Sequence, residues 1–396
     1  MAAVDSAEAK AAGRASLIYN PVVRGLFFQA VVFLALLAFL IWIIHNTSEN
    51  LRALGRSVSF EFLNERAGFD VGQNLIPYSS DSSYWRALLV GLVNTLVVAI
   101  VGIITATIIG FIIGIGRLSQ NWLIRKLCLF YVEIFRNIPP LLVIFFWYLG
   151  VLAILPAARE GFRLPFGSML SNRGLTMPAP VLGPGSWLVG VAFVVAIAMC
   201  IFVARRAKAR QMATGQRFPV MWTNIGLLIG LPLLAMVAAG FPISFDAPVL
   251  GAFQMSGGMT LSPEFLSLYL SLSIYTASFI AEIVRAGILG VSKGQSEAAA
   301  ALGIRPGIAT RLIIVPQAMR IIVPPLTSQY LNITKNSSLA IACGYADLVS
   351  IGGTILNKSG NSIQIVTIWM VVYLSISIVT SLFMNWFNAR VALVER

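Results

Sequence analysis

The sequence contains few charged side chains. Only 11% of its 396 residues are Asp, Glu, Lys or Arg, whereas 58% are hydrophobic. A soluble globular domain carries about 25% charged residues, so this chain lacks the polar surface that would cover a water-soluble fold. Together with a mean hydropathy of +0.85, this scarcity of charge excludes a soluble globular protein. It predicts that most of the chain faces lipid.

Residues that bind metals or form disulfides are equally scarce. The cysteines Cys128, Cys200 and Cys343 lie in apolar segments without a Cys-x-x-Cys spacing, and His45 is the only histidine. We therefore expect no disulfide and no metal site. The dipeptide Gly-Lys never occurs, which excludes a phosphate-binding loop, and neither H-E-x-x-H nor a nucleophile elbow is found. We expect no catalytic residue, no enzymatic activity and no cofactor bound by this chain.

Long apolar runs are abundant instead. A run of about 20 residues crosses a hydrocarbon layer of about 30 Å. Such runs lie near 25–44, 88–116, 127–155, 186–204, 222–240, 264–289, 321–345 and 363–388. They predict an all-α polytopic membrane protein with about eight transmembrane helices. The first run has no small-residue cleavage site, so we interpret it as a retained span and not as a signal peptide.

The net charge of +13 could indicate a nucleic-acid partner, but its distribution favours membrane topology. Alternate segments, counted from the N-terminus, hold about twice as many Lys and Arg as the segments between them, which by the positive-inside rule places both termini in the cytoplasm. The densest group, Arg205, Arg206, Lys208 and Arg210, has no acidic residue nearby. We expect membrane lipid around the chain and no nucleic acid.

The spans divide into two kinds. The first, fourth and fifth are almost purely apolar, as peripheral lipid-facing helices would be, whereas the second, third, sixth and seventh carry polar residues. We predict an N-terminal arm, first span and exterior loop over 1–87, and a transmembrane domain over 88–390. Residues 156–260 interrupt that domain as an insertion with two extra spans.

Two Glu-x-x-Arg pairs lie near the inner boundary of the predicted membrane. Glu133 and Arg136 stand in the third span, and Glu282 and Arg285 in the sixth. The i,i+3 spacing puts each Glu and Arg on one helix face, where they can pair. One interpretation is a charged gate at the inner mouth of a translocation path. The other is a static pair that neutralises charge near the interface.

Further polar residues and two Pro-Pro pairs mark the candidate path. Pro139-Pro140 and Pro324-Pro325 remove backbone donors and mark either broken helices that line a cavity or kinks that only shape the bundle. Lys335 could meet a substrate carboxylate or extend toward the interface. The other residues predicted to line the path or its gate are Asn137, Tyr275, Gln329, Asn332 and Asn336.

The loop from Lys293 to Pro316 is the most informative segment. Its spacing, E-A-A-x3-G-x9-I-x-x-P, includes Glu297, Ala298, Ala299, Gly303, Arg305 and Pro316. The alanine run favours a short helix, Gly303 can end it, and Pro306 can begin a second. An ordinary helical hairpin is the plain interpretation of this pattern. A small helix faced with alanines would also fit a cleft on another protein.

Residues 281–303, 315–340 and 131–148 resemble the permease subunits of polar amino-acid ABC importers, whose core is a five-helix type I bundle. The eight-span layout resembles the larger permease of the general L-amino-acid uptake systems of Gram-negative bacteria. Val315 stands where leucine is commoner in that family, and the insertion has no counterpart in its shorter members.

The resemblance implies translocation of L-amino acids across a bacterial inner membrane. Glu297, Ala298 and Ala299 would sit in a groove of a cytoplasmic ATP-binding subunit dimer, which carries the ATP and Mg, and Gly303 would set the turn. The other implied partners are a periplasmic amino-acid-binding protein and a second permease, a different chain. Nothing in the residues indicates which amino acids are carried.

Two other classes of function remain open at this point. An ion-coupled secondary transporter would use Glu133, Glu282 and Lys335 as an ion relay. A membrane sensor or scaffold would transport nothing.

Overall fold

The computed structural model describes residues 20–53, 59–216, 218–250 and 255–391. The basic residues Lys10, Arg14, Arg56, Arg217 and Arg396, which contribute to the topology prediction, lie outside the described residues. Within the described ranges, seven helices are long and apolar enough to cross a membrane, or eight if one bent pair counts as a single span. The all-α polytopic fold predicted from the sequence is therefore confirmed.

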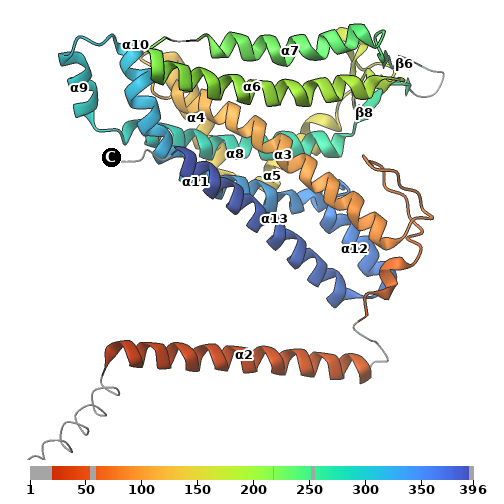
Figure 1. The fold of residues 1–396 in the computed structure, drawn as a ribbon. Helices are drawn as coiled ribbons and strands as arrows, with labels where there is room; N and C mark the ends of the chain where they lie inside the picture. The colour runs from red at the N-terminus through yellow and green to blue at the C-terminus, as the bar shows by residue number, and fades with distance from the viewer. Residues whose placement is uncertain (1–19, 54–58, 217, 251–254, 392–396) are drawn as a thin grey trace, which may run out of the picture.

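The helices occupy the predicted apolar runs. The long ones are α2 (Pro21–Ala53), α3 (Tyr84–Gly116), α4 (Trp122–Asn137), α6 (Ser186–Thr214), α7 (Val220–Ala238), α8 (Pro263–Leu289), α11 (Val315–Asn336) and α13 (Ser362–Val391). The short helical elements are η1 (Glu61–Asn64), α5 (Pro140–Phe145), η2 (Phe146–Leu152), η3 (Pro165–Gly167), α9 (Lys293–Ala301), α10 (Pro306–Ala309), η4 (Thr310–Ile314), η5 (Ser337–Ala342) and α12 (Leu348–Ser359). In Figure 1, α2 lies apart from the bundle that the others form.

Helices α3 and α8 form the centre of the bundle, and α3 meets α8 through small residues. Gly102, Ala106, Gly110 and Gly114 recur every fourth position on the buried face of α3. A Cβ atom at Gly110 would stand 2.5 Å from Cγ2 of Ile280, which is closer than atoms can pack. Small residues at this spacing let membrane helices approach closely. The close contact fixes the ends of α3 and α8 relative to each other.

The third predicted span is not one helix. It bends by 110° between α4 and the α5–η2 segment. Ile138, the residue before Pro139, has φ −105° and ψ 134°, which is extended, as the steric clash with a following proline favours. Of the two interpretations left open for Pro139-Pro140, the broken helix is the one that the structure shows, and a continuous span over 127–155 is wrong.

The matching Pro-Pro pair in the seventh span behaves differently. Helix α11 continues through Pro324 and Pro325, so of the two interpretations left open for this pair the broken helix is excluded. Ile322, Val323 and Leu326 are each no more than 4% exposed and pack in the core cluster that includes α8. Burial on both sides of the prolines holds the helical backbone in place. The helical span also begins earlier than predicted, at Pro306 instead of 321.

The region predicted as an insertion contains strands as well as helices. They are β1 (Phe162–Arg163), β2 (Met169–Ser171), β3 (Gly174–Met177), β4 (Ala179–Leu182), β5 (Ile243–Asp246), β6 (Val249–Leu250), β7 (Met255–Ser256) and β8 (Met259–Leu261). All the pairs are antiparallel, in a four-stranded sheet β1-β2-β3-β8 and the pairs β4-β5 and β6-β7. Leu175 pairs with Leu261, which joins the two ends of the insertion next to the start of α8.

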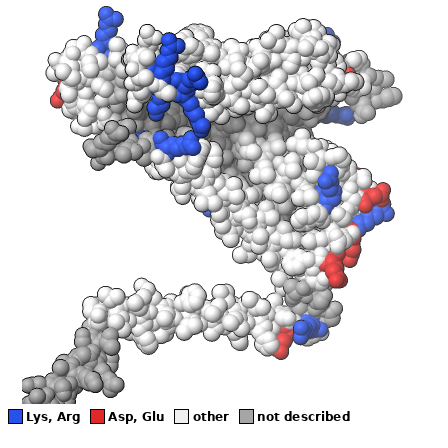
Figure 2. All heavy atoms as spheres, in the orientation of Figure 1, with Lys and Arg blue, Asp and Glu red and all other residues white. Residues whose placement is uncertain are grey.

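The two ends of the bundle differ in what they carry. The turn between α6 and α7, the short helices α9 and α10, and the start of α11 lie at one end, and the strands lie at the other (Figure 1). On the face shown in Figure 2, Lys and Arg side chains gather at the α9 end. Two of the segments predicted to share one side of the membrane, the α6–α7 turn and the α9–α10 loop, therefore lie at the same end.

Candidate functional site

The short helix α9 forms where the alanine run predicts it, and a glycine ends it. Gly303 has φ +70°, a left-handed conformation that side chains with a Cβ seldom adopt. Its N–H donates to the carbonyl of Ala300 at 2.9 Å, and Ile304 N–H donates to Ala299 at 3.0 Å. These two bonds are the Schellman arrangement that closes a helix on a glycine. Gly303 thus sets the direction in which the chain leaves α9.

One face of α9 and α10 is open to the surroundings. Glu297 and Ala298 are exposed, and the large apolar residues beside them are Leu302, 78% exposed, and Leu312, 61% exposed. Lys293, Arg305 and Arg311 on the same segment are also exposed. We call residues 293–312 the α9–α10 knob. Large apolar and basic side chains left exposed on one short segment are typical of a protein-docking element.

One member of the predicted docking motif faces the other way. Ala299 is only 2% exposed, so its side chain faces its own chain, whereas that of Ala298 is exposed. A helix of nine residues that packs on its own chain must turn one face inward, and the small Ala299 allows the chain after Gly303 to lie close. Gln317 Nε2 donates to Gln295 Oε1 at 3.2 Å, which ties α9 directly to α11.

Arg305 and Pro316 lie on either side of the second short helix. The carbonyl of Arg305 accepts hydrogen bonds from the N–H groups of Ile308 and Ala309 at 2.9 and 3.0 Å, which begins α10. Pro306 occupies the first turn, where its missing N–H costs nothing. Pro316 stands in the first turn of α11, and the helical segments run on from α10 through η4 to α11. A displacement of the knob is therefore passed to α11 without a flexible joint.

A single carboxylate, Glu282 on α8, contacts three arginines. Its Oε1 accepts hydrogen bonds from Nε and Nη2 of Arg285 at 3.2 and 2.6 Å. Its Oε2 accepts a hydrogen bond from Nη1 of Arg117 and lies 3.6 Å from Nη1 of Arg136 on α4. We call these four residues the Glu282 node. Three guanidinium groups against one carboxylate leave a net charge of +2 at the junction of three helices.

The node differs from the predicted pairs in two respects. The pair Glu282–Arg285 forms, but Arg136 contacts Glu282 instead of Glu133. Glu133 is exposed and makes no ion pair with the described residues, so the prediction of a Glu133–Arg136 pair is wrong. Arg117, whose side chain is 10% exposed, was predicted only as a topology signal. No local spacing connects it to Glu282, 165 positions away.

A polar stripe runs along α11. Asn332 and Lys335 are exposed, and Gln329 and Asn336 are partly exposed. Within the described ranges, the side chains of these four residues form no hydrogen bond or ion pair. Unsatisfied polar groups inside a membrane span are costly, so such groups face water or another protein. The stripe is therefore a candidate path lining or subunit contact.

The remaining predicted path residues lie near the node. Tyr275 packs its ring 5.0 Å from that of Phe279 on α8, and the guanidinium of Arg136 stands 5.7 Å from the Phe279 ring centroid. Asn137 Nδ2 donates to the carbonyl of Glu133 at 2.7 Å, at the end of α4. Tyr275 and Arg136 thus meet through Phe279, whereas Asn137 caps the bend before α5.

Comparisons with known proteins decide the family. No family model matches the chain. The general L-amino acid transport system permease protein AapQ of Rhizobium johnstonii is 62% identical, over 96% of this chain and 95% of that protein. The chain belongs to the permease subunits of amino-acid ABC transporters. The chain is therefore a transport component, and the comparisons give no support to an ion-coupled transporter.

A further relative is consistent with this membership. The permease is 42% identical to the glutamate/glutamine/aspartate/asparagine transport system permease protein BztB of Rhodobacter capsulatus, over 96% of each chain. A solved structure titled as an amino acid ABC transporter with histidines aligns with a TM-score of 0.46 and 18% identity, over 78% of this chain and 95% of that one.

Proposed function

We propose that this permease carries L-amino acids inward across a bacterial inner membrane, driven by ATP that a separate subunit hydrolyses. The relatives are named for general L-amino-acid transport and for transport of glutamate, glutamine, aspartate and asparagine. The observation that carries the proposal is the α9–α10 knob, because it projects an exposed helix and large apolar side chains that this chain itself leaves uncovered.

The knob would dock on a cytoplasmic ATP-binding subunit dimer. Glu297, Ala298 and Leu302 form its contact face, and the basic side chains of Lys293, Arg305 and Arg311 favour an acidic border on the partner's groove. ATP and Mg would bind to that partner, since this sequence has no phosphate-binding loop. Closure of the ATPase dimer would pull α9, and the α9–α11 link would rock the bundle as a rigid body.

The Glu282 node would form the inner gate. It joins α3, α4 and α8 by one carboxylate, so a small relative movement of these helices changes which arginine the carboxylate contacts. The polar stripe on α11 would line the path beyond it. Lys335 there supplies a positive charge for a substrate carboxylate, and Asn332 and Asn336 supply hydrogen-bonding groups.

The remaining partners follow from the exposed surfaces. A second permease, a different chain, would cover part of the lipid-depth surface of α11 and α13, and a periplasmic amino-acid-binding protein would deliver substrate at the strand end. The basic α9 end would face the cytoplasm, with both termini.

Reconstitution tests the proposal. We expect proteoliposomes that hold this permease, its partner permease and the ATPase to take up radiolabelled L-glutamate or L-glutamine. Uptake should require ATP and Mg on the side of the ATPase and binding protein on the opposite side. Omission of ATP should abolish it. Uptake driven by an ion gradient in vesicles without any ATPase subunit would contradict the proposal.

A further inference from the structure

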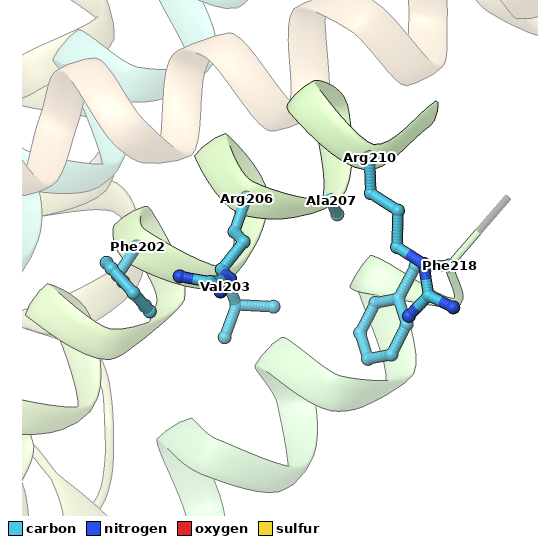
Figure 3. A pocket seen from close by; sticks show the side chains of 6 residues that line it. All are labelled: Phe202, Val203, Arg206, Ala207, Arg210 and Phe218. Carbon is cyan, nitrogen blue, oxygen red and sulfur yellow. The ribbon is translucent and has the colours of Figure 1, made fainter. Parts of the chain in front are cut away.

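A second site, which shares no residue with the knob or the node, lies in the peripheral helical hairpin of α6 and α7. A cavity of about 210 Å³ opens between the last turns of α6 and the start of α7. It is lined by Phe202, Val203, Arg206, Ala207, Arg210 and Phe218. In Figure 3, both guanidinium groups point from α6 toward α7. Ala207 is 9% exposed, and its small side chain leaves the space that the cavity occupies.

The cavity crosses the boundary between apolar and polar residues. The apolar run of the fourth span ends at Ala204, so Phe202 lies on its membrane side and the two arginines lie beyond it. Phe202 is 60% exposed, and Met221 and Trp222 in the first turn of α7 are 61% and 70% exposed. Large exposed apolar residues here face lipid, and Trp is enriched at the membrane interface. The cavity is therefore apolar at its membrane side and cationic at its aqueous side.

The two arginines lack an anionic partner. Arg206 and Arg210 are one helical turn apart. The guanidinium of Arg206 stands 5.9 Å from the ring centroid of Phe202, and Nη2 of Arg210 donates to Oε1 of Gln216 at 3.2 Å. Neither forms an ion pair with the described residues. The sequence has no Asp or Glu between Glu160 and Asp246, so an anion at this site must come from outside the hairpin.

We propose that this cavity binds the phosphate headgroup of an anionic phospholipid from the leaflet at the α9 end. Two planar guanidinium forks one turn apart suit the oxygens of a phosphate diester, which they can bind with paired hydrogen bonds. Basic pockets between membrane helices on the cytoplasmic side select anionic headgroups. A soluble anion could bind the two arginines but would leave Phe202, Val203 and the exposed start of α7 in contact with water. The acyl chains of a phospholipid would cover these apolar residues as well. The inference stands independently of the proposed transport function.

Native mass spectrometry of the full transporter, reconstituted in nanodiscs of phosphatidylglycerol and phosphatidylcholine, tests the proposal. We expect the double variant Arg206→Gln/Arg210→Gln to retain about tenfold less phosphatidylglycerol, since charge-assisted bonds to phosphate are lost. The matched control is Arg205→Gln/Lys208→Gln, which removes the same charge from exposed positions on the same turns that do not line the cavity. It should retain the lipid within about twofold.

Other outcomes would overturn the proposal. Equal loss in both double variants would mean that the general charge of the interface attracts the lipid. Displacement of the lipid by millimolar inorganic phosphate would indicate a site for a free anion. Equal retention of phosphatidylcholine and phosphatidylglycerol would exclude recognition of the headgroup charge. If the Gln variant does not insert, Arg206→Lys/Arg210→Lys keeps the charge and removes the forks. It should lose phosphatidylglycerol several-fold, and full retention would contradict the proposed geometry.

Discussion

Replacing Gly303 with valine is expected to abolish ATP-driven uptake while leaving the permease inserted in the membrane. A Cβ at Gly303 would meet no atom within 4 Å, so the constraint is the φ of +70° alone. A β-branched residue resists that conformation, at a cost of roughly 1–2 kcal/mol. If the backbone leaves the conformation to relieve this strain, the two hydrogen bonds that close α9 break. The knob then leaves its docking orientation. Uptake and ATP hydrolysis stimulated by the binding protein, both in proteoliposomes, measure the effect.

Two substitutions serve as controls for Gly303→Val. Gly303→Asn should retain much of the activity, because asparagine tolerates the left-handed conformation better than other side chains. Gly294→Ala lies in α9, where no positive φ is required, and should be neutral. Normal coupling in Gly303→Val would show that the direction of the chain after α9 does not matter for docking.

The second large effect is expected at the Glu282 node. Glu282→Gln leaves Arg117, Arg136 and Arg285 together without their shared carboxylate. Removing one partner of a buried pair costs roughly 3–5 kcal/mol, and the partial exposure of this node reduces the figure. A change of about 1.4 kcal/mol between inward-open and outward-open states already alters their ratio tenfold. We expect uptake to fall about tenfold or more in proteoliposomes, with the assembled complex still isolated on a size-exclusion column.

Glu133→Gln is the matched control for the node. It removes the same charge from the end of α4, but Glu133 is exposed and forms no ion pair within the described ranges, so uptake should stay within about twofold. Loss of assembly in parallel with uptake would indicate that the node is a static clamp. Unchanged uptake with normal assembly in Glu282→Gln would rule out a gate.

Local chemistry was sufficient to predict much of this fold. The apolar runs located the spans because each helix satisfies its own backbone in lipid. The alanine run, Gly303 and Pro306 located α9 and α10 because caps and turns depend on a few neighbouring residues. For the same reason, the start of α8 is indicated by Ser262, which accepts a hydrogen bond from Phe265 N–H at 3.2 Å, followed by Pro263.

Features that depend on distant packing could not be predicted in this way. Pro139-Pro140 and Pro324-Pro325 look alike in sequence, but only the first breaks its helix, because burial against α8 holds the second. The link between Arg117 and Glu282 arises because α3 and α8 approach closely at their small residues. No spacing between neighbouring residues in the sequence indicates this contact. The strands β3 and β8 pair across the length of two spans, and at four and three residues they are too short for an alternating pattern to be recognised in the sequence.

Cysteine crosslinking tests docking of the α9–α10 knob most directly. In the assembled transporter, with Cys128, Cys200 and Cys343 replaced by alanine, Ala298→Cys offers an exposed thiol on α9 and Ala299→Cys a buried one. We expect a bifunctional maleimide to join the chain to the ATPase subunit through position 298 and not through position 299. Absence of an ATPase adduct at 298, or labelling of that thiol from the periplasmic side, would contradict the account.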